Sequence, residues 1–183
     1  LGAQPFLDDV VAALLTQIGE GWVADGITPA QEHLSTGIIV RVLQRLTDQA
    51  RSKDGPTLVV ATLQGELHGL GARLTSATAI FEGWRVAYLG TDLPVADIVT
   101  TAESVNANAV AISIVKLDDL SDTVSLVRAL RERLDSQVDL LLGGRATGFL
   151  EAERFPPGVS VLSGLEELRD VLRKRNPYSR MRS

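Results

Sequence analysis

His68 is one of only two histidines in the chain, and its surroundings suit a ligand site. The apolar run 57–63 has the composition of a buried strand, and the glycine-rich segment Gly65-Glu66-Leu67-His68-Gly69-Leu70-Gly71 follows it. A strand that ends in such a turn places the imidazole at the carboxyl end of a sheet, where open α/β sheets bind ligands. Glu66 is close enough in sequence to hold one ring nitrogen while the other binds a metal. The pattern indicates a ligand site.

Two other interpretations of this segment stay open at this point. A lone histidine in a loop is commonly part of the polar surface. Gly65, Gly69 and Gly71 also fit a turn that cradles the phosphates of a dinucleotide. Against the dinucleotide, the following strand has no acidic residue at its tip, although Asp92 lies just beyond, and no Tyr-x-x-x-Lys follows. The spacing of the motifs further along the chain distinguishes between these interpretations.

Three short motifs follow one another along the chain. They are Glu66-x-His68-x-x-Gly71, then, after 41 residues, Ser113-Ile114-Val115, and after another 27 residues, Gly143-Gly144. Their order and spacing resemble those of the cobalamin-binding domain shared by methionine synthase, corrinoid methyl carriers and cobalamin-dependent regulators. Val115 stands where that family usually has leucine, and Glu66 where aspartate is commoner. The resemblance covers roughly residues 57–175.

This resemblance implies a cobalamin site at the carboxyl edge of the sheet. His68 would be the lower axial ligand of the cobalt, and small residues at the strand tips would leave a slot for the nucleotide tail. The cofactor-binding residues implied in this part of the chain are Glu66, Leu67, His68, Gly69, Leu70, Gly71, Ser113, Val115, Gly143 and Gly144.

Alternating strand and helix patterns predict the fold. Apolar β-rich runs at 57–63, 84–90, 108–115, 138–142 and 158–162 alternate with amphipathic segments at 70–82, 94–105, 119–135, 147–154 and 164–175. Strands joined by such helices form parallel sheets through right-handed crossovers. We therefore expect a five-stranded parallel, doubly wound, flavodoxin-like sheet over residues 54–176. A small helical cap (1–53) precedes it, and a basic tail (177–183) follows.

The predicted cap is a hairpin of two helices. Its second helix begins with a capping box, with Thr28 as the cap and Gln31 three residues later. The apolar positions of this helix give it a wide stripe that we expect to be buried: Leu34, Ile38, Ile39, Val42, Leu43 and Leu46.

The hairpin carries a second resemblance. Trp22, nine further residues and then Glu32-His33 resemble the Trp-x9-Glu-His motif of light-responsive cobalamin regulators related to MerR-type repressors. In that family these three residues enclose the adenosyl group of adenosylcobalamin, so the resemblance implies the same role for Trp22, Glu32 and His33. The residue after the tryptophan is typically a histidine there, whereas Val23 cannot bind cobalt.

Composition and charge limit the kinds of partner that the chain can bind. The chain of 183 residues has net charge −5, and its last eleven residues hold five basic and no acidic side chains, leaving 13 basic against 23 acidic residues elsewhere. Such an acidic body should repel nucleic acid, so we expect no direct DNA binding. The lack of cysteine, of a membrane-spanning apolar run and of a secretion leader leads us to expect a cytoplasmic protein.

These observations predict a non-enzymatic cobalamin sensor of a transcriptional regulator, with adenosylcobalamin favoured over methylcobalamin. Its partners would be further copies of itself, a DNA-binding domain or a partner protein. The alternative is a corrinoid protein that carries a methyl group in a methyltransferase system. A mutase subunit is a weaker third choice, because the substrate barrel is missing.

Overall fold

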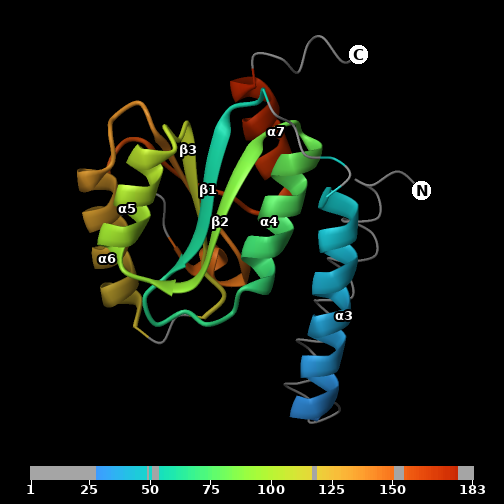
Figure 1. Ribbon diagram of the computed structural model, residues 1–183. Helices are drawn as coiled ribbons and strands as arrows, with labels where there is room; N and C mark the ends of the chain where they lie inside the picture. The colour runs from blue at the N-terminus through green and yellow to red at the C-terminus, as the bar shows by residue number, and fades with distance from the viewer. Residues whose placement is uncertain (1–27, 49, 51–53, 117–118, 151–154, 177–183) are drawn as a thin grey trace.

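The computed structural model describes residues 28–48, 50, 54–116, 119–150 and 155–176. Its centre is a five-stranded, all-parallel sheet with the strand order β2-β1-β3-β4-β5 (Figure 1). The strands are β1 (Thr57–Leu63), β2 (Arg85–Leu93), β3 (Ala109–Ser113), β4 (Asp139–Gly143) and β5 (Val159–Val161). This is the flavodoxin-like order of a doubly wound sheet, and it confirms the predicted fold class.

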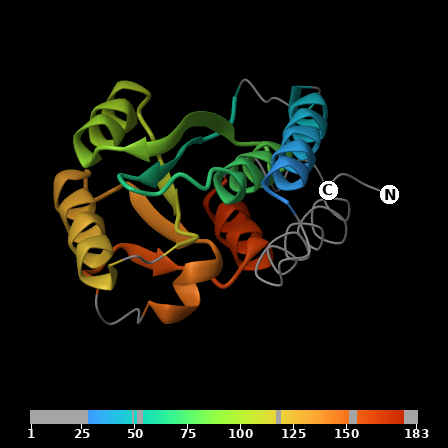
Figure 2. The ribbon, with the colours of Figure 1, turned by 90° about the horizontal axis from the view of Figure 1, so that it is seen from below.

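Helices cover both faces of the sheet. They are α4 (Leu70–Phe81), α5 (Val95–Ser104), α6 (Leu120–Arg133) and α7 (Leu165–Arg175). α5 and α6 lie on one face, and α4 and α7 on the other (Figure 2). Because β1 and β3 are covered on both sides, every residue of these two strands is buried, as in the interior of parallel sheets.

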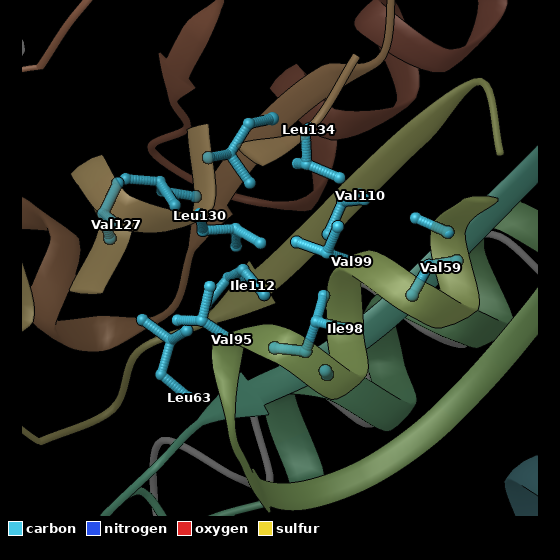
Figure 3. Packing of buried hydrophobic residues seen from close by; sticks show 14 of the residues in the cluster. Val59, Leu63, Val95, Ile98, Val99, Val110, Ile112, Val127, Leu130 and Leu134 are labelled. Carbon is cyan, nitrogen blue, oxygen red and sulfur yellow. The ribbon is translucent and has the colours of Figure 1, made fainter. Parts of the chain in front are cut away.

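The larger apolar cluster lies between the sheet and the α5–α6 layer. In Figure 3, Val95, Ile98 and Val99 of α5 lie against Val110 and Ile112 of β3, with side chains of α6 alongside. The cluster on the opposite face combines several alanines of α4 and β3 with the buried Trp84. This packing fixes the strand tips from which the loops of the candidate site emerge.

One predicted helix is different in the structure. Instead of a helix over 147–154, a short 3-10 helix, η2 (Arg145–Phe149), follows β4. The Thr147 hydroxyl donates to the carbonyl oxygens of Gly144 (2.7 Å) and Leu162 (3.2 Å), which holds the segment in a tight turn against the strand tips. Residues 151–154 lie outside the described residues.

The helix α3 (Pro29–Asp48) precedes the sheet domain. Its capping box is confirmed, since Thr28 N–H donates to Gln31 Oε1 (2.9 Å) and Gln31 N–H to Thr28 Oγ1 (3.3 Å). It packs on α4 through Ile39 and Leu43, which join a small buried cluster. The first predicted helix of the hairpin, with Trp22 and Val23, lies outside the described residues.

The apolar stripe of α3 is buried over only part of its length, in contrast to the prediction. Ile39 and Leu43 are buried, whereas Leu34 and Ile38 are 63% and 48% exposed. The reason is the position of the helix: its amino-terminal half extends past the amino-terminal end of α4 and past the carboxyl edge of the sheet (Figure 1). No helix within the described residues combines the length and hydropathy that a membrane span requires.

Candidate functional site

The loop that carries His68 connects β1 to α4 at the carboxyl edge of the sheet. Gly65 turns the chain with a φ of +88°, a conformation in the left-handed region that glycine adopts without strain. His68 follows just before α4, and 58% of its side chain is exposed. The structure thus places this histidine in the loop after the first strand, as the sequence predicted, with more than half of its side chain exposed.

Glu66 orients the imidazole of His68. Its Oε1 lies 2.6 Å from Nδ1 of His68 and also accepts the His68 backbone N–H at 2.9 Å. A carboxylate only accepts hydrogen bonds, so in the neutral ring Nδ1 carries the proton and Nε2 keeps its lone pair. A neutral imidazole held in this way is ready to bind a metal through Nε2.

The second oxygen of Glu66 reaches a different loop. Oε2 accepts the backbone N–H groups of Val115 (2.9 Å) and Lys116 (2.8 Å), which follow β3. Burial alone would raise the pKa of the Glu66 carboxyl, but the backbone donors of His68, Lys116 and Val115, together with the His68 side chain, lower that pKa below its usual value. The carboxylate is thus ionised and ties the His68 loop to the tip of β3.

Ser113 ends β3 on the face covered by α4. Its hydroxyl is buried and has no hydrogen-bond partner among the described residues. Such groups are rare in folded proteins, and a bound water or ion is one of the explanations for them. Gly71, in the first turn of α4, faces this hydroxyl, because a Cβ atom at position 71 would lie 2.6 Å from Ser113 Oγ. Two motifs that are distant in sequence therefore meet at one point.

The glycine pair ends β4 beside Ser113. Gly143 is the register partner of Ser113, and a Cβ atom built on it meets no described atom within 4 Å. Gly144 has a φ of +111°, and its Cβ would lie 2.3 Å from the carbonyl oxygen of Ile114. Gly143 thus borders open space, whereas Gly144 allows the backbones of two neighbouring strand tips to approach closely.

A pocket of about 190 Å³ adjoins these residues on the α6 side. Glu66 and Ser113 line it together with three residues that the sequence analysis missed: Lys116, Asp119 and Asp122. The sequence signal for Asp119 was its place before a helix, and it does cap α6 by accepting the N–H groups of Ser121 (2.7 Å) and Asp122 (3.1 Å). The spacing of the motifs gave no signal for Lys116, because it is the backbone N–H of this residue that contacts Glu66.

Of the remaining predicted site residues, those within the described part of the chain lie around this edge. Leu67, next to His68, is 70% exposed, while Leu70 is half-buried in the first turn of α4. His33 is exposed in the first turns of α3, and Glu32 precedes it in the same helix. Because α3 packs beside α4, its amino-terminal half stands at the flank of the edge that carries His68 (Figures 1 and 2).

Comparison with known proteins gives one family match. Residues 56–171 match the model of the B12 binding domain. Trimethylamine corrinoid protein 1 of Methanosarcina acetivorans is 24% identical over 119 residues, which cover 64% of this chain and 55% of that protein. The HTH-type transcriptional repressor CarH of Myxococcus xanthus is 28% identical over 163 residues, which cover 87% of this chain and 54% of that protein.

The chain thus spans about half the length of these two relatives. Among solved structures, the monomethylamine corrinoid protein of Methanosarcina barkeri has a similar fold. The TM-score is 0.67 at 16% identity, and the alignment covers 95% of this chain and 84% of that one. At this identity the likeness concerns the fold alone.

Proposed function

The chain belongs to the B12 binding domain family, and on that premise we propose that it is the cobalamin sensor module of a transcriptional regulator. In this proposal adenosylcobalamin is held between the helical cap and the carboxyl edge of the sheet. Cobalamin binding itself is supported by the family match and by corrinoid proteins and a repressor among the relatives. Our proposal goes further in two respects: the chain is a sensor and not a methyl carrier, and it prefers adenosylcobalamin to methylcobalamin.

The residues at the edge fit this cofactor. His68 would bind the cobalt through Nε2, while Glu66 would hold the proton on Nδ1. The unpartnered Ser113 hydroxyl would hydrogen-bond the nucleotide tail, and the open space at Gly143 would admit it. Bound adenosylcobalamin would supply a cobalt–carbon bond that light can break.

The exposed apolar side chains have a role in the same proposal. In the described part of the chain, the large exposed hydrophobic residues are Leu34, Ile38, Leu67 and Phe149. Leu67 is part of the His68 loop, and Leu34 and Ile38 lie toward the amino-terminal end of α3, which extends past the edge (Figure 1). A flat corrin ring between them would cover apolar surface that water otherwise contacts.

The observation that carries the sensor proposal is Trp22-x9-Glu32-His33, with His33 exposed in the amino-terminal half of α3 beside this edge. A nucleoside is large and polar enough to need an indole lid and hydrogen-bond partners, whereas a methyl group needs neither. The match to the repressor covers more of the chain than residues 56–183 could supply, so it extends into this helical segment.

A methyl-carrying corrinoid protein is the second candidate. The trimethylamine corrinoid protein among the relatives favours it. In that case α3 would cover a methyl group and later move aside to let a methyltransferase reach it.

In the sensor proposal, Val23 provides no atom that could bind cobalt. The sensor would therefore work without a second histidine ligand from position 23.

Reconstitution tests the proposal. The whole chain, labelled with ¹⁵N-histidine, is loaded with cobalamin, and the cobalt is reduced to Co(II). Electron paramagnetic resonance should show hyperfine coupling to one ¹⁵N nucleus, which His68→Ala abolishes and the matched control His33→Ala preserves. Coupling only to the ¹⁴N of the cofactor's own base in the wild type would refute His68 ligation. Tighter binding of adenosylcobalamin than of methylcobalamin is the second requirement, and equal binding would favour the carrier.

A further inference from the structure

Strand β2 carries a bulge beside the His68 loop. Along β1, Ala61 pairs with Gly90 and Leu63 with Leu93, so β2 has one residue more than β1 between these pairs. Gly90 has a φ of +101°, and Asp92 a φ of +61°, unusual for a residue other than glycine. Bulges of this kind occur next to functional sites, where they redirect a side chain.

The bulge directs Asp92 onto the loop that leads to His68. Its Oδ1 accepts the backbone N–H of Gly65 at 2.8 Å. Its own backbone N–H donates to the Glu66 carbonyl oxygen (3.1 Å) and to Thr62 Oγ1 (3.0 Å), and Thr62 Oγ1 donates to the same carbonyl at 2.5 Å. Asp92 therefore holds the two residues at which the chain turns out of β1.

The neighbouring residue of the bulge touches the other side of the loop. A Cβ atom at Gly69 would lie 2.8 Å from Thr91 Cγ2, so the backbone directly after His68 packs against Thr91. Adjacent residues of one bulge thus contact the loop both before and after His68. Glu66 fixes the ring, but this bulge fixes the backbone from which Glu66 and His68 both project.

We propose that Asp92 is a positioning residue for the cobalt ligand. By holding Gly65 and Glu66 it sets the height of the His68 ring above the sheet edge, and with it the strength of the bond to cobalt. The inference rests on the proposed function, in which His68 binds the metal. It extends the site to the edge strand β2, which contributes no residue to the three sequence motifs.

Three variants separate this role from a backbone preference. Asp92→Asn keeps an acceptor oxygen and tolerates positive φ, Asp92→Gly keeps the φ and removes the acceptor, and Asp92→Ala removes both. Each ¹⁵N-histidine-labelled full-length variant is loaded with cobalamin and reduced to Co(II). The fraction of cobalt coupled to ¹⁵N, the dissociation constant and the melting temperature of the cofactor-free protein are measured.

We expect Asp92→Asn to behave like the wild type. Asp92→Gly should bind cobalamin about tenfold more weakly, at the lower end of the range for groups that support a metal ligand, with a reduced ¹⁵N-coupled fraction and little change in melting temperature. Wild-type coupling and affinity in Asp92→Gly would overturn the proposal. His68→Ala is measured in parallel. If His68→Ala keeps the ¹⁵N coupling of the wild type, the proposal that His68 binds the cobalt is wrong. If His68→Ala loses the coupling while Asp92→Gly keeps wild-type coupling and affinity, only the role of Asp92 is refuted.

Discussion

A Cβ atom at position 71 would lie 2.6 Å from Ser113 Oγ, so the first turn of α4 and the tip of β3 meet only because residue 71 is glycine. The two residues belong to motifs separated by 41 residues, and their contact explains the spacing in physical terms. The helix that starts after His68 must pass close to the strand tip that would receive the cofactor's tail. A larger side chain at position 71 would push these elements apart.

Gly71→Ala should therefore weaken both the fold and the site. Because Ser113 is buried at the point where the new methyl group would lie, accommodating that group should lower the free energy of unfolding by about 1–3 kcal/mol. Chemical denaturation of the cofactor-free protein measures this. In the Gly71→Ala, Ser113→Ala double variant the clashing oxygen is gone, and part of the stability should return. An unchanged deficit in the double variant would contradict the contact.

Glu66→Ala removes an acceptor that serves four N–H groups from two loops. We expect cobalamin affinity to fall by about 10–100-fold, as for other groups that orient a metal ligand. Stability should also decrease, because the N–H groups of Val115 and Lys116 lose their partner. Isothermal titration and denaturation measure the two effects. Glu103→Ala, which removes an exposed glutamate from α5, is the control of equal charge and should leave both values unchanged.

The pH dependence of stability follows from the same carboxylate. The pKa of Glu66 is lower in the folded protein than the ordinary value near 4.5. The group therefore contributes stability that is fully present above that ordinary value and is lost as the pH falls through the lower, folded-state pKa. Wild-type and Glu66→Gln proteins without cofactor should differ most in unfolding free energy near neutral pH and converge in acid. A constant difference across the acid range would contradict this assignment.

Much of the fold was predictable because its signals are local. β1 and β3 are continuous apolar runs that alternate with amphipathic helical segments, so a parallel sheet follows from pattern alone. The segment after β4 was not predictable in this way, because contacts of Thr147 with Gly144 and Leu162 hold it in a 3-10 turn. The exposure of Leu34 and Ile38 likewise depends on how far α3 extends past the sheet.

The candidate site likewise contains residues that local sequence patterns reveal and residues that only the folded structure reveals. His68, Glu66 and Ser113 are side chains whose types and spacing carry information, and the structure brings them to one edge. The sequence identifies Asp92 only as an acidic residue just after a strand, because its contacts depend on a bulge in β2 that no local pattern predicts. Lys116 acts through its backbone N–H, which any residue other than proline would provide.

The adenosyl lid gives a selectivity prediction. If Trp22, Glu32 and His33 enclose a nucleoside, replacing that nucleoside by a methyl group leaves buried polar groups without partners, at a cost of roughly 1–3 kcal/mol for each group. The wild-type chain should therefore bind adenosylcobalamin more tightly than methylcobalamin. Dissociation constants for both cobalamins, measured in the dark, test this.

Trp22→Ala should narrow that preference, because an open lid lets water satisfy the same polar groups. The loss should fall on adenosylcobalamin. Methylcobalamin affinity and the unfolding free energy of the sheet domain should stay nearly unchanged, since the substitution leaves Trp84, which is buried in that core, in place. A parallel loss for both cofactors would instead make Trp22 a packing residue of the cap. Equal affinities of the wild type for adenosylcobalamin and methylcobalamin would refute the adenosyl lid. The methyl-carrier function would then be favoured, because the helical segment would not discriminate between the two upper ligands of the cobalt.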